Sequence, residues 1–106
     1  MISGVLAPNH NTALLAHHGL IACGGSIEEA TYRAWFFERA ARMQLDAVAV
    51  GKTGGELQRV PHDVASAARD WRASVGPVNA HFNAWARKAL RDPANRALAA
   101  VIGARA

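Results

Sequence analysis

The sequence predicts an α/β fold in which a short N-terminal β-hairpin is followed by three to four helices. One observation is a pair of short apolar runs, Ala13–His17 and Leu20–Cys23, separated by a tight bend of His18 and Gly19 in which the glycine supplies a positive φ. The other is a series of amphipathic stretches from Ser26 onward, interrupted by glycine and proline. Because two strands rarely form a stable sheet alone, we expect the hairpin to need partners beyond these residues.

The composition is that of one small globular domain over residues 1–106, with 51% hydrophobic and 19% charged residues. Its longest apolar runs are too short to cross a bilayer, so we expect no membrane insertion. The net charge is +4, but the basic residues are dispersed, and we expect no nucleic-acid partner. Cys23 is the single cysteine and cannot form an internal disulfide, which favours the cytoplasm.

The first predicted helix begins after Ser26. Its hydroxyl can accept a hydrogen bond from the amide of Glu29, whose carboxylate can reach back toward the helix start, as in a capping box. Apolar residues then recur at helical spacing: Ile27, Ala30, Ala34, Phe37, Ala41, Leu45 and Val48. Trp35 and Phe36 lie off this stripe, so we expect the helix to contact two neighbours. Gly51 is predicted to end it.

Proline residues mark the beginnings of the later helices. Pro61 and Pro77 suit the first turns of a second and a third helix, and Asp92-Pro93 suits the start of a last, alanine-rich helix. The apolar stripe of the second helix is Val64, Ala67, Ala68, Trp71 and Val75, and that of the third is Val78, Phe82, Trp85, Ala89 and Leu90. We expect the three tryptophans of the chain to meet in one hydrophobic cluster.

The adjacent histidines His17 and His18 are the first candidates for chemistry. Successive residues of a strand point to opposite faces, so only one of the two would face a given site. An imidazole at a glycine bend can bind a metal such as zinc, but the chain has no HxH or HxxxH pair, and His10, His62 and His81 stand alone. The residues therefore leave two roles open, a metal ligand or a hydrogen-bonded structural histidine.

Two further motifs favour structural roles. Gly51-Lys52-Thr53 resembles the end of a phosphate-binding loop, but Asp46 stands where that pattern requires glycine, so we interpret the segment as a helix end. Cys23 would need a nearby base to act as a nucleophile, and its apolar neighbours predict a buried small side chain instead. The sequence therefore predicts no catalytic residue and no residue that binds an organic cofactor.

Beyond these patterns, Leu14–Gly24, Ser26–Ala30 and Glu38–Ala47 together resemble the class II aldolase/adducin family. Family members carry an apolar strand, a His-Gly bend and a capped helix with a Glu-Arg-Ala and Gln-Leu pattern. Asn79–Leu90 is similar to the C-terminal helix of the family. The resemblance extends from Ala13 to Leu90 and corresponds to the C-terminal half of a full-length member.

This resemblance implies that the chain is a fragment of an αβα sandwich whose complete form is a homo-oligomer. Catalytic members, among them fuculose-phosphate-aldolase-like and sugar-acid-decarboxylase-like proteins, use a divalent metal, usually Zn²⁺, held by three histidines. They make or break carbon–carbon bonds next to the carbonyl of a small substrate. By this match His18 is the last of the three ligands, and His17 is not a ligand.

The family's HxH element and catalytic carboxylate have no match in this sequence. We therefore expect a truncated form of a metal-dependent lyase, with the alternative of a noncatalytic remnant that serves as a helical interaction or oligomerisation module, as adducin does.

Overall fold

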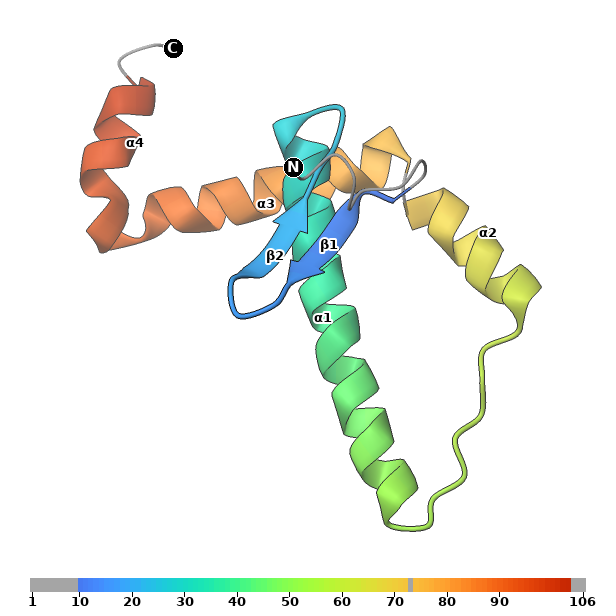
Figure 1. The fold of residues 1–106 in the computed structure, drawn as a ribbon. Helices are drawn as coiled ribbons and strands as arrows, with labels where there is room; N and C mark the ends of the chain where they lie inside the picture. Colours follow the sequence, from blue (N-terminus) through green and yellow to red (C-terminus); the bar gives the residue numbers. More distant parts are fainter. Residues whose placement is uncertain (1–9, 73, 104–106) are drawn as a thin grey trace.

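A computed structural model describes residues 10–72 and 74–103, and it confirms a hairpin followed by helices (Figure 1). In this part of the chain the elements are β1 (Thr12–Leu15), β2 (Gly19–Ala22), α1 (Ile27–Lys52), α2 (His62–Arg72), α3 (Val75–Arg91), the 3₁₀ turn η2 (Pro93–Asn95) and α4 (Arg96–Gly103). The four α-helices of the described residues agree with the predicted three to four.

The hairpin is antiparallel, and Leu15 pairs with Gly19 at its closed end. The connecting loop is residues 16–18, one residue longer than the predicted bend: β1 ends at Leu15, so the predicted strand end at His17 is wrong, and Gly19 pairs as part of β2. The predicted left-handed glycine is confirmed, since Gly19 has a φ of 118° and His17, inside the loop, has a φ of 62°. The amide of His18 donates to the carbonyl of Leu15 at 3.1 Å, which closes the turn.

The junction between β2 and α1 is held by a chain of hydrogen bonds. Ser26 caps α1, because its Oγ accepts from the amide of Glu29 at 3.2 Å. The Glu29 carboxylate accepts from the amide of Gly25 at 2.6 Å, one residue before the amide that a capping box uses. Arg33 then donates to Glu29 at 2.5 Å and to the carbonyl of Cys23 at 2.6 Å. The first turns of α1 are thereby tied to the end of β2.

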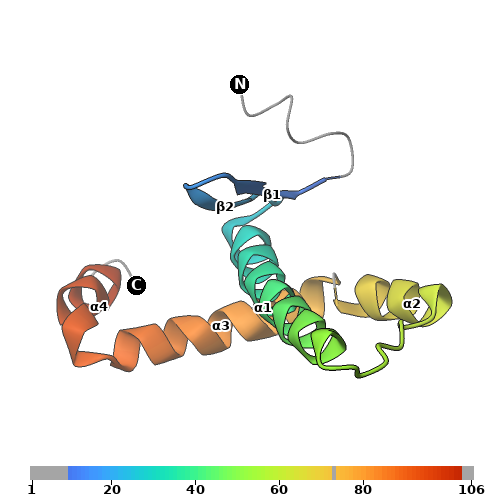
Figure 2. The same ribbon diagram turned by 60° about the horizontal axis from the view of Figure 1, so that its bottom comes forward.

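Helix α1 contacts two neighbours as predicted, the hairpin and α3, but its apolar stripe is only partly covered. The buried residue of the described part of α1 is Tyr32, which lies off the predicted stripe. Ile27 and Leu45, both on the stripe, are 68% and 70% exposed. The reason is visible in Figures 1 and 2: the hairpin and α3 lie against the N-terminal half of α1, and the C-terminal half extends past them.

The beginnings of α1, α2 and α3 lie within two residues of the predicted positions, whereas the last helix begins as the 3₁₀ turn η2 and becomes α4 only at Arg96. Helix α1 continues one residue past Gly51, and the amide of Thr53 donates to Val50 at 3.0 Å, so Gly51-Lys52-Thr53 is a helix end. The carbonyl of Pro61 accepts the first hydrogen bond of α2. The predicted cap at Asp92 is confirmed by a 2.9 Å bond from the amide of Ala94 to its carboxylate.

One boundary changes an assignment. Val75 begins α3, so its predicted place on the stripe of the second helix is wrong.

An aromatic cluster joins α1 to α3. Its members are Tyr32, Trp35, Phe36, His81 and Trp85. The ring centroids of Trp35 and Trp85 are 5.2 Å apart, and those of Tyr32 and His81 are 5.3 Å apart. The predicted three-tryptophan cluster is wrong for Trp71, which is 68% exposed on α2. Helix α2 lies to one side of α1 after a long connection, so its stripe does not reach the cluster (Figure 1).

The fold is open. Among the described residues, Tyr32 and Val78 are the only buried hydrophobic residues. The radius of gyration is 17.5 Å, against about 13 Å for a compact domain of roughly 100 residues. The accessible surface is 8824 Å² for a mass of 11.3 kDa, against about 5,700 Å² for a compact monomer of that mass. Within the described residues, no helix has the length and apolar character to cross a membrane.

Candidate functional site

His18 lies in the exposed loop that closes the hairpin. The preceding residues Thr12–Leu15 are an extended strand, and the loop places the imidazole at the end of the hairpin in contact with solvent. A side chain in this position is accessible to a ligand from outside the chain, whereas a histidine packed among apolar residues would not be.

The His18 ring is oriented by its own backbone. Its Nδ1 lies 2.9 Å from the carbonyl oxygen of Ala16. A carbonyl oxygen can only accept, so Nδ1 donates in this contact, and in the neutral imidazole the lone pair is then on Nε2. Metal-bound histidines commonly have this arrangement, in which one nitrogen donates to a carbonyl and the other binds the metal. The local geometry is therefore compatible with a ligand role through Nε2.

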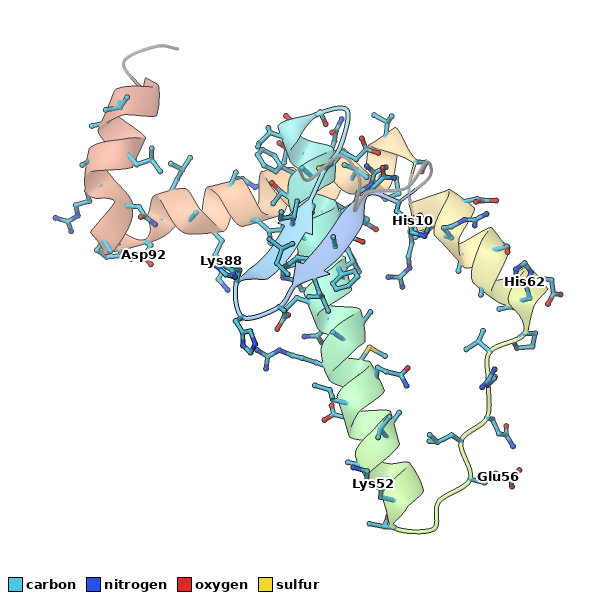
Figure 3. The ribbon with its side chains drawn as sticks, in the orientation of Figure 1. His10, Lys52, Glu56, His62, Lys88 and Asp92 are labelled. Carbon is cyan, nitrogen blue, oxygen red and sulfur yellow. The ribbon has the colours of Figure 1, made fainter. Side chains whose placement is uncertain are left out.

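The other histidines do not join His18 in a common site. His81 is half-buried in the aromatic cluster, and its Nδ1 donates to the carbonyl of Pro77 at 2.8 Å, which makes it a structural histidine. His62 begins α2, and Figure 3 shows it on the far side of the molecule from the hairpin loop, above Glu56 and Lys52. His10 precedes β1 at the opposite end of the hairpin from the loop.

The described residues supply one histidine ligand and no complete metal site. In residues 10–72 and 74–103, no group of three or more His, Cys, Asp or Glu side chains is arranged to hold a metal ion. A zinc site with useful affinity takes three or four protein ligands. His18 therefore fits one position of a coordination sphere that the described residues do not complete.

Cys23 is exposed, so the prediction of a buried small side chain is wrong. It follows β2 directly, and its backbone is engaged on both sides: its amide donates to Asn11 at 2.8 Å and its carbonyl accepts from Arg33. These bonds fix the backbone at the edge of the hairpin, where the apolar neighbours that suggested burial do not cover the thiol.

Tyr32 and Arg33 also organise the junction, and the sequence patterns did not single them out. Tyr32 is the buried centre of the aromatic cluster, and Arg33 forms a mostly covered ion pair with Glu29. The signal for the pair was present, since Glu and Arg four residues apart on a helix are in contact distance. Tyr32 gave no such signal, because its burial depends on how α3 crosses α1.

Comparisons with known proteins find similarity in the N-terminal part of the chain. The model of the Class II Aldolase and Adducin N-terminal domain matches residues 2–45. The "Putative aldolase class 2 protein" of Pseudomonas aeruginosa is 35% identical over 65 residues, which are 61% of this chain and 24% of that protein. The chain thus matches about a quarter of the length of this relative. No solved structure matches the chain significantly.

The family match covers the hairpin, the loop that carries His18 and the first part of α1. It ends at Leu45, so the similarity of Asn79–Leu90 to the C-terminal helix of the family stays a prediction. Residues 2–45 of this chain are thus similar to the class II aldolase/adducin family.

Proposed function

We propose that this chain is part of a metal-dependent carbon–carbon lyase in which His18 is one histidine ligand of a Zn²⁺ ion. Its substrate is a small carbonyl compound of the phosphosugar or sugar-acid type. The remaining ligands and the catalytic carboxylate belong to the complete protein. The proposed location is the cytoplasm, because the chain has one cysteine and no internal disulfide.

The observation that carries this proposal is the state of the His18 ring. The ring is exposed in the hairpin loop of a class II aldolase-like chain, and the bond from Nδ1 to Ala16 leaves Nε2 as the ligand atom. His17, its neighbour, is also exposed, so exposure alone does not distinguish the two. What favours His18 is its position directly before Gly19 together with the hydrogen bond that orients its ring.

The test is an aldol-cleavage assay of protein produced from the natural gene, supplied with Zn²⁺ and phosphorylated ketoses, in which release of the aldehyde product is followed. We expect His18→Asn to lower kcat/KM at least about 100-fold and to reduce the zinc content, because loss of one ligand weakens the whole site.

His17→Asn is the matched control, since asparagine tolerates the left-handed backbone at this position. It should retain both the activity and the metal. Equal activity of the His18→Asn variant and the wild-type protein would refute the ligand role.

A second candidate function is noncatalytic interaction through self-association, and the open fold favours it. The accessible surface of 8824 Å² exceeds that of a compact monomer by about 3,000 Å², which is in the size range of obligate interfaces. Large apolar side chains contribute to this surface on α1, α2 and the connection between them, among them Met43, Leu45, Val60, Val64 and Trp71. A homo-oligomer would cover them.

Sedimentation velocity over a range of protein concentrations tests this candidate. Self-association predicts a sedimentation coefficient that rises with concentration and a melting temperature that rises with it. A monomer with a sharp, concentration-independent unfolding transition would contradict it. This measurement does not involve His18, so its result is independent of the lyase proposal.

A further inference from the structure

A cavity of about 460 Å³ lies between β1, α1, the C-terminal end of α2 and the beginning of α3. Asn11 and Thr12 line it at the open end of the hairpin, where Thr12 pairs with Ala22. His18 lies in the loop at the closed end, where Leu15 pairs with Gly19. The length of the hairpin therefore separates this cavity from the proposed metal ligand.

The floor of the cavity is apolar and partly aromatic. Tyr32, Phe36 and Phe37 of α1 line one side, and Val78 of α3 lines another. Tyr32 and Val78 are the two residues that the described part of the chain buries. The volume lies within the range of about 300–1,000 Å³ that is usual for small-molecule sites. The floor thus offers a preformed surface for a flat or aliphatic group.

The rim of the cavity is positively charged. Arg33, Arg69 and Arg72 line it together with one carboxylate, Glu29. Glu29 and Arg33 neutralise each other at 2.5 Å, and Glu29 is also engaged by the amide of Gly25. The remaining charge of the rim is therefore that of Arg72 and Arg69 on α2, and the charge of Arg69 is partly offset by Asp70 at 3.0 Å.

These two guanidinium groups differ in their surroundings. That of Arg72 lies over the ring of Phe36, 5.3 Å from its centroid. Stacking uses the face of the guanidinium and leaves the N–H groups in its plane available to a ligand. Arg69 contacts Asp70 at 3.0 Å through Nε, so its terminal nitrogens are not part of that contact.

From this arrangement we infer that the cavity binds a small amphipathic anion, a carboxylate or phosphate monoester with an aromatic or aliphatic body. The body contacts Phe36, Phe37 and Val78, and the anionic head accepts hydrogen bonds from Arg72 and Arg69. A planar guanidinium suits both heads, because it can donate two parallel hydrogen bonds to two oxygen atoms. A neutral ligand forgoes these charge-assisted bonds, and a cation is repelled by the arginines.

The inference is tested by measuring the binding of three probes to the full chain. Amide chemical shifts and tryptophan fluorescence report the binding. The probes are phenyl phosphate, phenol and inorganic phosphate. We expect phenyl phosphate to bind at least about tenfold more tightly than either of its parts. Benzoate in place of phenyl phosphate shows whether the site prefers a carboxylate. If inorganic phosphate or phenol binds as well as phenyl phosphate, the combined site does not exist.

Variants that replace one arginine with neutral glutamine show which arginines bind the anionic head. Arg72→Gln should weaken phenyl phosphate binding about tenfold, and Arg69→Gln gives a second test should the end of α2 be altered in the first variant. Arg87→Gln removes the same charge from an exposed position of α3 that does not line the cavity, and it should leave the affinity unchanged. Equal weakening by Arg72→Gln and Arg87→Gln would mean general attraction by net charge and would overturn the inference. His18→Asn should have no effect on binding, which separates this site from the proposed function.

Discussion

Two regions of the molecule can be compared: the junction of β2 with α1, residues 22–36, and the arm formed by residues 43–72. Both contain regular apolar helical patterns, but they differ in the contacts that stabilise them. In the junction, the Ser26 hydroxyl accepts from the amide of Glu29, the side chains of Glu29 and Arg33 bond to backbone groups of Gly25 and Cys23, and Tyr32 is buried. In the arm, Leu45 is 70% exposed and Trp71 is 68% exposed.

This difference separates helix formation from helix packing. Helix α2 has a regular apolar stripe, and the structure confirms a helix there, yet Val64 on the stripe is 53% exposed. Periodicity requires only that a face be apolar, whereas burial requires a second surface at the right place. The junction has such a surface in α3, and the described residues provide none for the outer part of the arm.

The largest effect that would sharpen this comparison is expected from Tyr32→Ala. Tyr32 is 7% exposed and its ring contacts Phe36, His81 and Trp85. Removing the ring should lower the free energy of unfolding by about 2–4 kcal/mol, which is much of the stability of a small domain. Urea unfolding followed by circular dichroism measures the change.

Trp71→Ala is the matched variant in the arm. It removes a larger aromatic side chain from an exposed position, so in the monomer the expected change is below about 0.5 kcal/mol. A loss as large as that of Tyr32→Ala, at a concentration where the chain is monomeric, would show that the arm is packed and would break the comparison.

A smaller effect is expected from Glu29→Ala. This change removes the acceptor of the Gly25 amide and the partner of Arg33. The expected loss is about 1–2 kcal/mol, the usual cost of losing a helix-cap interaction together with a partly exposed ion pair. Glu56→Ala, at an exposed position of the connection after α1, is the control and should leave the unfolding midpoint unchanged.

Local chemistry explains which features the sequence could predict. The cap at Ser26, the left-handed Gly19 and the cap at Asp92 depend on residues within a few positions of one another, and all three are confirmed. The fate of the three tryptophans depends on where α2 lies relative to α1 and α3, which no short-range pattern encodes. The hydrogen bond that orients His18 is local, but the sequence does not specify it, because it depends on the left-handed residue His17 in the loop.

Two glycine-to-alanine replacements should change the stability by intermediate amounts and in opposite directions. Gly19 has a φ of 118° and open space at the position of a Cβ atom, so the cost of Gly19→Ala is backbone strain alone, about 1–2 kcal/mol. Gly76 lies in the first turn of α3, also with open space, and Gly76→Ala should stabilise the chain by about 0.5 kcal/mol through helix propensity. Thermal unfolding of both variants measures the two signs. A stabilising Gly19→Ala would contradict the left-handed geometry on which the position of His18 depends.

The smallest effect is expected from Glu38→Gln, which compares two ion pairs of identical spacing on α1. Glu29–Arg33 is two-thirds or more covered and continues into backbone hydrogen bonds, whereas the side chains of Glu38 and Arg42 are 51% and 77% exposed. The hydrogen bond from Arg42 to Glu38 raises the pKa of Arg42. A raised pKa of a base contributes stability below its unfolded value and loses it only as the pH rises through the folded value, here in strongly alkaline solution. Between about pH 5 and pH 9 the titration of Arg42 therefore leaves stability unchanged, and solvent and salt screen the pair itself.

We expect Glu38→Gln and the wild-type chain to have the same urea midpoint at physiological salt, while Glu29→Gln lowers it. A loss at Glu38 equal to that at Glu29 would mean that spacing alone, and not the backbone contacts of the junction, determines what these pairs contribute.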